Sequence, residues 1–187
     1  MTAHGDDETG PGLDAAYALT GPEDAKRLYA GWAATYDGVF AERTGYRPAR
    51  RVAELFVASG GAGPVLDAGC GTGLVADALP TGLAIDGVDL SPEMLAAARE
   101  KGRYRQLVEA DLTRTLPFET GAFHAVLCAG TFTQGHVGPE ALPELVRVLQ
   151  TGGLMVLSIR PDHAEKTGFQ PVFDGLTAGA EALTLGA

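Results

Sequence analysis

The segment that most constrains the fold is Val65-Leu-Asp-Ala-Gly-Cys-Gly-Thr-Gly73, an apolar run that reaches an acid and then breaks into three alternate glycines. A short apolar run is typical of a buried strand. Closely spaced glycines are typical of a turn that lets a ligand approach the backbone. Asp89 and Asp111 close two further strand-like runs, so acids recur every 22 residues. We therefore predict three acids in one crevice at the end of a sheet.

Strand-like and helix-like segments alternate after Pro64. The predicted strands cover residues 65–68, 84–89, 104–110, 122–129 and 154–159. The predicted helices cover 74–79, 91–101 and a segment through Leu142, Leu145, Val146 and Leu149 that ends at Gly152-Gly153. Such alternation predicts parallel pairing with right-handed crossovers, hence an α/β fold with a doubly wound, Rossmann-like, mostly parallel sheet.

Chain length and local composition predict one domain. Its 187 residues suit a single core. Residues 1–13 hold three acids and almost no apolar anchor, so we expect a disordered tail. Residues 14–187 form the domain, with N-terminal helices at 20–60, an α/β core at 64–160 and a short C-terminal segment at 161–187. One N-terminal helix is expected around Leu28, Trp32 and Tyr36, and another from about Pro48 to Gly60-Gly61.

Charge and cysteine content narrow the partners and the compartment. A net charge of -10 repels phosphate backbones and anionic lipid surfaces, so neither nucleic acid nor a membrane is an expected partner. Cys70 and Cys128 are too few for a zinc site or a disulfide framework, which favours a reducing compartment. With no long apolar run and no signal-peptide pattern, we expect a cytoplasmic protein without a bound metal.

The glycine loop fits two common nucleotide sites poorly. A dinucleotide site needs G-x-G-x-x-G, whereas Leu74 stands where the last glycine belongs and Asp67 would crowd a diphosphate. A P-loop needs Gly-Lys-Ser/Thr after the loop, which this chain lacks. A nicotinamide oxidoreductase is therefore a weaker alternative, and P-loop kinases and nucleoside triphosphatases are excluded.

Together these segments resemble class I S-adenosylmethionine-dependent methyltransferases. Val65 to Gly73 is similar to their first motif, Gly87-Val-Asp-Leu-Ser-Pro-Glu-Met-Leu95 to the second, and Ala110-Asp-Leu112 to the third. Leu149-Gln-Thr-Gly-Gly-Leu154 resembles the turn before their fifth strand. Tyr29-Ala-Gly-Trp-Ala-Ala-Thr-Tyr-Asp37 and Gly130-Thr-Phe-Thr-Gln-Gly-His-Val137 also resemble the small methyltransferases named for the Williams-Beuren region.

The resemblance implies S-adenosylmethionine as the cofactor and assigns a role to each part of the crevice. Asp67 would face the ligand's ammonium group through water, Asp89 would accept both ribose hydroxyls, and Asp111 would accept the adenine amino group. The methionine end would lie on Gly69, Cys70, Gly71 and Gly73. Leu90, Met94 and Leu112 would wall the adenine, and Ala129-Gly130 would pass near the sulfonium.

The acceptor side of the site is less constrained. We predict transfer of a methyl group to a small molecule, which needs in-line approach more than a catalytic residue. His136 is the best-placed candidate base if the acceptor must lose a proton. The family's N-terminal helix folds over the cofactor, so Tyr29 or Tyr36 would border the pocket. We interpret Cys70 and Cys128 as packing residues rather than nucleophiles.

The C-terminal end departs from the resembled family, which usually adds two further strands. After Ile159 we expect one helix near 173–183 and a stub at 183–185, leaving a shortened sheet whose fifth strand is an exposed edge. Such an edge is normally covered or paired, which suggests either tail packing or a homodimer. The shortening also allows an alternative function, a protein that binds S-adenosylmethionine or S-adenosylhomocysteine without turnover.

Overall fold

The structure is a computed structural model that describes residues 47–133 and 137–176. The elements of this part of the chain are, in order, α4 (Pro48–Ala58), β1 (Val65–Ala68), α5 (Leu74–Ala78), β2 (Ile85–Asp89), α6 (Pro92–Glu100), β3 (Gln106–Glu109), β4 (Phe123–Phe132), η2 (Pro139–Ala141), α7 (Leu142–Val148), β5 (Leu149–Ile159), α8 (Pro161–Thr167) and α9 (Phe169–Leu176). The predictions for the tail, for Tyr29, Tyr36 and His136, and for residues from 177 onward lie outside the described residues.

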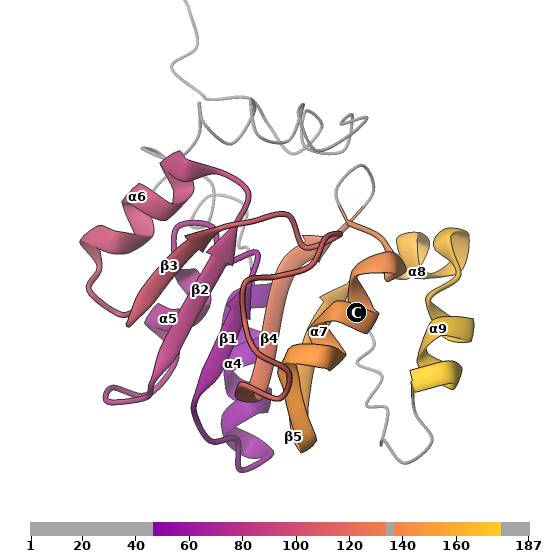
Figure 1. Cartoon of the computed structure of the whole chain (residues 1–187), viewed down its shortest axis with the longest axis horizontal. Helices are drawn as coiled ribbons and strands as arrows, with labels where there is room; N and C mark the ends of the chain where they lie inside the picture. The colour runs from indigo at the N-terminus through magenta and orange to yellow at the C-terminus, as the bar shows by residue number, and fades with distance from the viewer. Residues whose placement is uncertain (1–46, 134–136, 177–187) are drawn as a thin grey trace, which may run out of the picture.

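The strands form one sheet in the order β3-β2-β1-β4-β5, and every neighbouring pair is parallel. The order runs outward from β1 to β3 on one side and then from β4 to β5 on the other. Strand order therefore reverses beside β1, which is where ligands bind in sheets of this kind. Helices cover both faces (Figure 1), and the predicted doubly wound α/β fold is confirmed.

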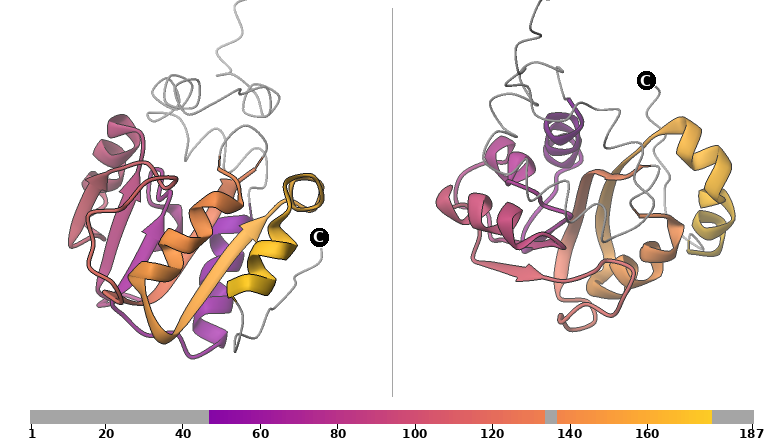
Figure 2. Two further views of the ribbon diagram at one scale, coloured as in Figure 1. Left: turned by 45° about the vertical axis from the view of Figure 1, so that its right-hand side comes forward. Right: turned by 90° about the horizontal axis from the view of Figure 1, so that it is seen from above.

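The central strands are buried on both faces, which explains their almost continuous apolar runs. In β1, Leu66 and Ala68 belong to a core shared with α7 and α9, whereas Val65 belongs to a second core shared with α4 and α5. The views in Figure 2 show α4 and α7 on opposite sides of the sheet. Two separate apolar layers thus cover the two faces of the sheet.

Local sequence signals set the bounds of two helices. Ser91 caps α6, because its hydroxyl accepts a hydrogen bond of 3.2 Å from the backbone N–H of Met94, and Pro92 occupies the first turn. Pro48 opens α4, and Gly60 follows its end with a φ of 71°. Both predicted helices are confirmed.

The boundary between α7 and β5 was predicted wrongly. The helix ends at Val148, and Leu149 already begins β5 instead of closing the helical stripe. The register of β4 with β5 jumps from Phe123–Leu149 to Ala125–Leu154, so the Gly152-Gly153 pair forms an irregularity inside the strand. Gly152 has a φ of 76°, a left-handed conformation that lets the extra residues loop out.

Other element bounds also differ from prediction. The third strand is shorter and leaves Tyr104 outside it, whereas the fourth continues to Phe132. Beyond β5, α8 and α9 replace the helix expected at 173–183, as far as the structure describes this segment. Phe169 of α9 is buried and packs edge-on against Phe132, with ring centroids 5.5 Å apart. The described segment after β5 therefore packs on the core.

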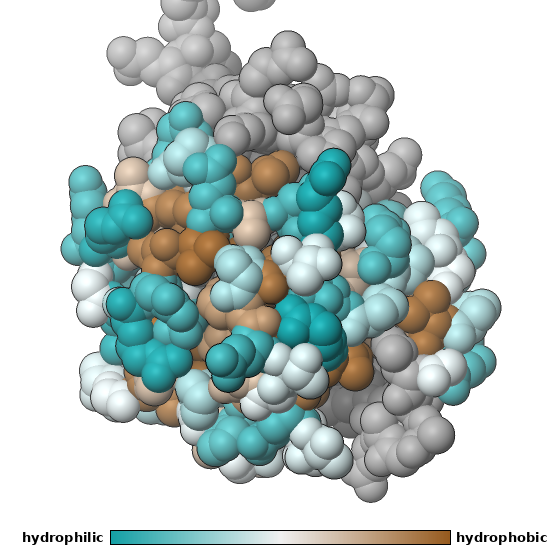
Figure 3. Space-filling model, viewed as in Figure 1, coloured by the Kyte–Doolittle hydropathy of each residue, from teal (hydrophilic) through white to brown (hydrophobic). Residues whose placement is uncertain are grey.

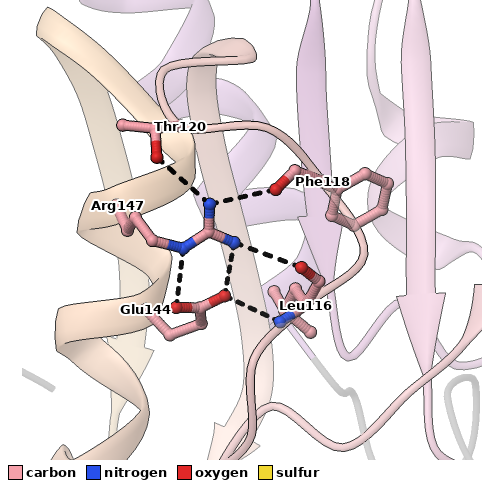
Figure 4. A network of polar contacts seen from close by, with 5 residues as sticks. All are labelled: Leu116, Phe118, Thr120, Glu144 and Arg147. Atoms are coloured by element: carbon pink, nitrogen blue, oxygen red, sulfur yellow. Dashed lines mark hydrogen bonds and ion pairs between the residues drawn. The ribbon is translucent and has the colours of Figure 1, made fainter.

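A polar network ties the segment between β3 and β4 to α7 (Figure 4). The Arg147 guanidinium donates to the carbonyl oxygens of Leu116 and Phe118 at 3.1 and 3.0 Å, and to both carboxylate oxygens of Glu144. Glu144 in turn accepts the backbone N–H of Leu116 at 2.7 Å. The segment that follows Asp111 is thus anchored to α7 at Leu116 and Phe118.

Candidate functional site

The three acids lie along adjacent strand ends. Asp67 is in β1, Asp89 is the last residue of β2, and Asp111 follows β3. Because β3, β2 and β1 are neighbours in a parallel sheet, their carboxyl ends meet at one edge, with strands spaced about 4.8 Å apart. The structure therefore brings the three acids to the same edge, as predicted.

The glycine loop adopts backbone conformations that other residues avoid. Gly69, Gly71 and Gly73 have φ values of 69°, 53° and 93°. A Cβ at Gly69 would collide with the Thr131 side chain, whereas a Cβ at Gly71 would have no atom of the described residues within 4 Å apart from its own chain neighbours. Gly69 thus serves internal packing, and Gly71 faces open space where a ligand could approach.

The carboxylate of Asp89 joins this loop to β2. Its Oδ2 accepts the backbone N–H of Gly71 at 2.8 Å, and its Oδ1 accepts the backbone N–H of Ser91 at 2.9 Å. Burial raises the pKa of Asp89, while these backbone donors act to lower it. Each oxygen keeps further acceptor capacity, so Asp89 could still bind a pair of hydroxyl donors.

Asp67 is fully buried, and only one of its two carboxylate oxygens has a hydrogen-bond partner among the described residues. Its Oδ2 accepts a hydrogen bond of 2.7 Å from the Tyr104 hydroxyl, but its Oδ1 has no hydrogen-bond partner among the described residues. Burial raises the pKa of Asp67 to about 7; the Tyr104 hydrogen bond lowers it and the charge of Asp89 raises it. An orphaned, buried carboxylate oxygen is an acceptor suited to a cationic ligand group.

Asp111 makes local polar contacts with residues of the turn that follows β3. Its Oδ1 accepts from the backbone N–H and the hydroxyl of Thr113, at 2.9 and 2.7 Å, and its Oδ2 lies 3.5 Å from Nε of Arg114. This arrangement stabilises the turn after β3. Adenine binding by Asp111 stays a prediction.

The predicted apolar wall has two buried members and one partly exposed member. Met94 and Leu112 are buried, whereas Leu90 is partly exposed. On the face shown in Figure 3, apolar side chains gather near α6 and β3 within a mostly polar surface. The wall therefore offers apolar contact, and its role toward adenine stays a prediction.

On the other side of β1, Ala129 and Gly130 are partly buried in β4. The backbone N–H of Gly130 donates to the Ser158 hydroxyl at 2.8 Å. Cys70 and Cys128 are buried free thiols, and burial raises their pKa values, that of Cys128 to about 12. Neither thiol forms a thiolate at neutral pH, in agreement with a packing role.

Tyr104 belongs to the site and was missed at the sequence level. It precedes β3, and its contact with Asp67 spans 37 residues along the chain and crosses β2. A single aromatic residue before a strand carries no signal that names its partner. Only the folded sheet brings the two side chains together.

Among the described residues, no group of three or more His, Cys, Asp or Glu side chains could hold a metal ion. Within residues 47–133 and 137–176, no helix combines the length and the apolar character needed to cross a bilayer.

Comparisons with known proteins agree with this geometry. Residues 66–157 match the family model described as a methyltransferase domain. Methyltransferase-like protein 27 of Homo sapiens is 38% identical over 152 residues, which cover 76% of this chain and 61% of that protein. Demethylmenaquinone methyltransferase of Thermus thermophilus is 43% identical over 105 residues, covering 52% of this chain and 47% of that protein. The chain thus spans between about half and three fifths of these relatives.

Solved structures show the same fold. A putative S-adenosyl-L-methionine-dependent methyltransferase from Methanococcus maripaludis superposes with a TM-score of 0.63, covering 97% of this chain and 93% of that one. Its sequence identity of 19% restricts the conclusion to the fold.

Proposed function

The chain belongs to the class I S-adenosylmethionine-dependent methyltransferase family, and from this premise we propose that it transfers a methyl group to a small-molecule acceptor. S-adenosylmethionine supplies an activated methyl group on a sulfonium centre when bound. The protein's own contribution is to bind and orient the reactants. We also propose that the chain lies near the small Williams-Beuren-region methyltransferases, because its residues 29–37 and 130–137 resemble them.

The observation that carries the proposal is Oδ1 of Asp67, which is buried near the carboxyl end of β1 and has no hydrogen-bond partner among the described residues. Gly71 follows four residues later in the glycine loop. An ammonium group would satisfy this oxygen directly or through water, and the missing side chain at Gly71 would leave room for the methionine end. Asp89, with acceptor capacity left on both oxygens, would hold the ribose hydroxyls. Asp111 would accept from the adenine amino group.

The remaining assignments belong to the same proposal. Leu90, Met94 and Leu112 would line the adenine, and Ala129-Gly130 would pass near the sulfonium. Tyr29, Tyr36 and the candidate base His136 keep the roles implied by the resemblance. The net charge of -10 favours a small acceptor over nucleic acid or an anionic membrane. The two free thiols suit a reducing compartment such as the cytoplasm.

Calorimetric titration with S-adenosylmethionine and S-adenosylhomocysteine tests the proposal, with Gly71→Ala and Gly60→Ala as matched variants. Both glycines have a positive φ and open space at the Cβ position, but only Gly71 lies in the loop. Each variant should lose about 1 kcal/mol of stability from backbone strain. We expect Gly71→Ala to weaken binding by at least about tenfold and Gly60→Ala to bind like the wild type.

Absence of heat with both ligands would overturn the proposal, as would wild-type binding by Gly71→Ala. Incubation with methyl-labelled S-adenosylmethionine and fractionated small molecules then tests turnover. Labelled product supports transfer. Binding without any labelled product would instead favour the alternative, a binding protein without turnover.

A further inference from the structure

We propose that Tyr104 is a positioning residue for the amino-acid end of the methyl donor. Its hydroxyl holds one carboxylate oxygen of Asp67, so that the other oxygen is left as the acceptor for the ligand's ammonium group. The inference rests on the proposed function and adds to it a residue that does not itself touch the reacting atoms.

Two glycines make room for the Tyr104 ring. Asp67 of β1 stands opposite Gly87 of β2 in the strand register. A Cβ at Gly87 would lie 3.0 Å from Cε1 of Tyr104, and a Cβ at Gly73 would lie 3.1 Å from Cε2. Both positions lack this atom, so the ring passes over β2 and reaches Asp67 from the β3 side.

The hydrogen bond has one direction. A tyrosine hydroxyl carries a single proton, which Tyr104 donates to Oδ2 of Asp67 at 2.7 Å. Burial and the nearby charge of Asp67 raise the pKa of Tyr104 well above its usual range, so the hydroxyl stays a donor at physiological pH. The bond restrains the carboxylate and leaves Oδ1 unpaired.

Among the described residues, no cation is found to act on the Asp67 carboxylate. The titratable groups that act on it are Tyr104 before β3 and Asp89 at the end of β2, while the charge of Asp67 itself acts on Cys70 in the glycine loop and on Cys128 in β4. The tyrosine and both thiols are neutral, and Asp89 is an acid. Farther along the ring of Tyr104, Asp77 of α5 is paired with Lys101 at 2.7 Å. Because the described residues around Asp67 supply no positive group, we assign that role to the ammonium group of the ligand.

The test compares two ligands across pH. S-adenosylmethionine carries the ammonium group, whereas 5′-methylthioadenosine keeps the adenosine and the sulfur but has no amino-acid end. For Tyr104→Phe we expect an affinity for S-adenosylmethionine reduced by about tenfold near pH 7, with the affinity for 5′-methylthioadenosine unchanged. The ratio of the two affinities compares ligands on the same folded molecules, so a loss of stability does not invalidate it.

The pH profile gives a readout that a merely structural role would not move. Binding of a cation needs ionised Asp67, so wild-type affinity for S-adenosylmethionine should rise with pH through a midpoint at about 7. The Tyr104 hydrogen bond lowers the pKa of Asp67, so its loss in Tyr104→Phe should move this midpoint to higher pH.

A double-mutant cycle with Asp67→Asn isolates the coupling. We expect Tyr104→Phe to have no further effect on S-adenosylmethionine binding in the Asp67→Asn background. Two results for Tyr104→Phe would overturn the positioning role while leaving the proposed function intact. One is an equal loss of affinity for both ligands, and the other is an unshifted pH midpoint of S-adenosylmethionine binding. Failure of the wild type to bind either ligand would overturn both.

Discussion

Asp67 combines two properties that rarely occur together in a folded protein, full burial and an unpaired carboxylate oxygen. A buried charge without a partner is costly, so the protonated form is favoured until the pKa of about 7 is passed. The unpaired acceptor therefore costs folding stability, and it is the group that we propose as the acceptor for the ligand's cation. Its pKa links folding to pH in a way that can be measured.

The sign of this link follows from the direction of the shift. The pKa of Asp67 rises from 3.8 to about 7 on folding, so the folded state binds the proton more tightly than the unfolded state. The contribution of Asp67 to the free energy of unfolding is therefore largest below about pH 4 and is lost as pH rises to about 7. Above that window both states are ionised, and the contribution is constant.

We expect Asp67→Asn to flatten the pH dependence of stability between about pH 4 and pH 7, by up to about 4 kcal/mol for a shift of this size. Urea denaturation at several pH values measures the change. The quantity to compare is the slope of the free energy of unfolding against pH. The absolute free energy is less informative, because the asparagine amide leaves an unpaired donor of its own. Asp174→Asn, at an exposed site on α9, should keep the wild-type slope. An unchanged slope in Asp67→Asn would contradict the assignment.

At the scale of elements, α7 holds the segment between β3 and β4 through Arg147 (Figure 4). This guanidinium serves two backbone carbonyls and one carboxylate, whereas Arg50 of α4 makes an exposed ion pair with Glu54. Loss of the Arg147 guanidinium leaves partly buried backbone acceptors without their donor. Loss of the Arg50 guanidinium removes only one exposed partner of the Glu54 carboxylate, which water can replace.

We expect Arg147→Met to lower the Tm by about 4 °C and Arg50→Met to leave it within about 1 °C. Thermal denaturation followed by circular dichroism measures both. Equal effects of the two substitutions would show that the network contributes no more than a surface ion pair.

The element bounds show where sequence patterns suffice. Ser91 and Pro92 fix the start of α6 because capping is a contact between residues three apart. The α7–β5 boundary was missed because Leu149 continues the helical spacing while its backbone pairs with Phe123 of β4. A glycine pair is typical of a helix end, but here it serves a strand irregularity, which depends on the partner strand.

At the scale of the whole molecule, β5 forms an edge of the sheet. Among the described residues it pairs only with β4, although α8 and α9 lie at this end of the sheet (Figures 1 and 2). An edge strand offers unpaired backbone groups to another copy of the chain. We therefore keep the homodimer through β5 as a proposal.

Size-exclusion chromatography with light scattering should give twice the mass of one chain, with a dimer fraction that grows with protein concentration. Because two copies of charge -10 repel each other, added salt should also favour the dimer. A monomer at all concentrations and salt levels would contradict the proposal and favour cover by the chain itself.

Sequence patterns were enough to predict the class of fold and the end of the sheet at which the three acids lie. These follow from short-range patterns: apolar runs that end at acids, alternate glycines and helix caps. Four features became visible only in the folded molecule: the pairing of Asp67 with Tyr104, the Oδ1 of Asp67 without a partner among the described residues, the strand irregularity at Gly152-Gly153, and the helices α8 and α9. Those features depend on which strands become neighbours, and contacts across a sheet leave no periodicity along the chain.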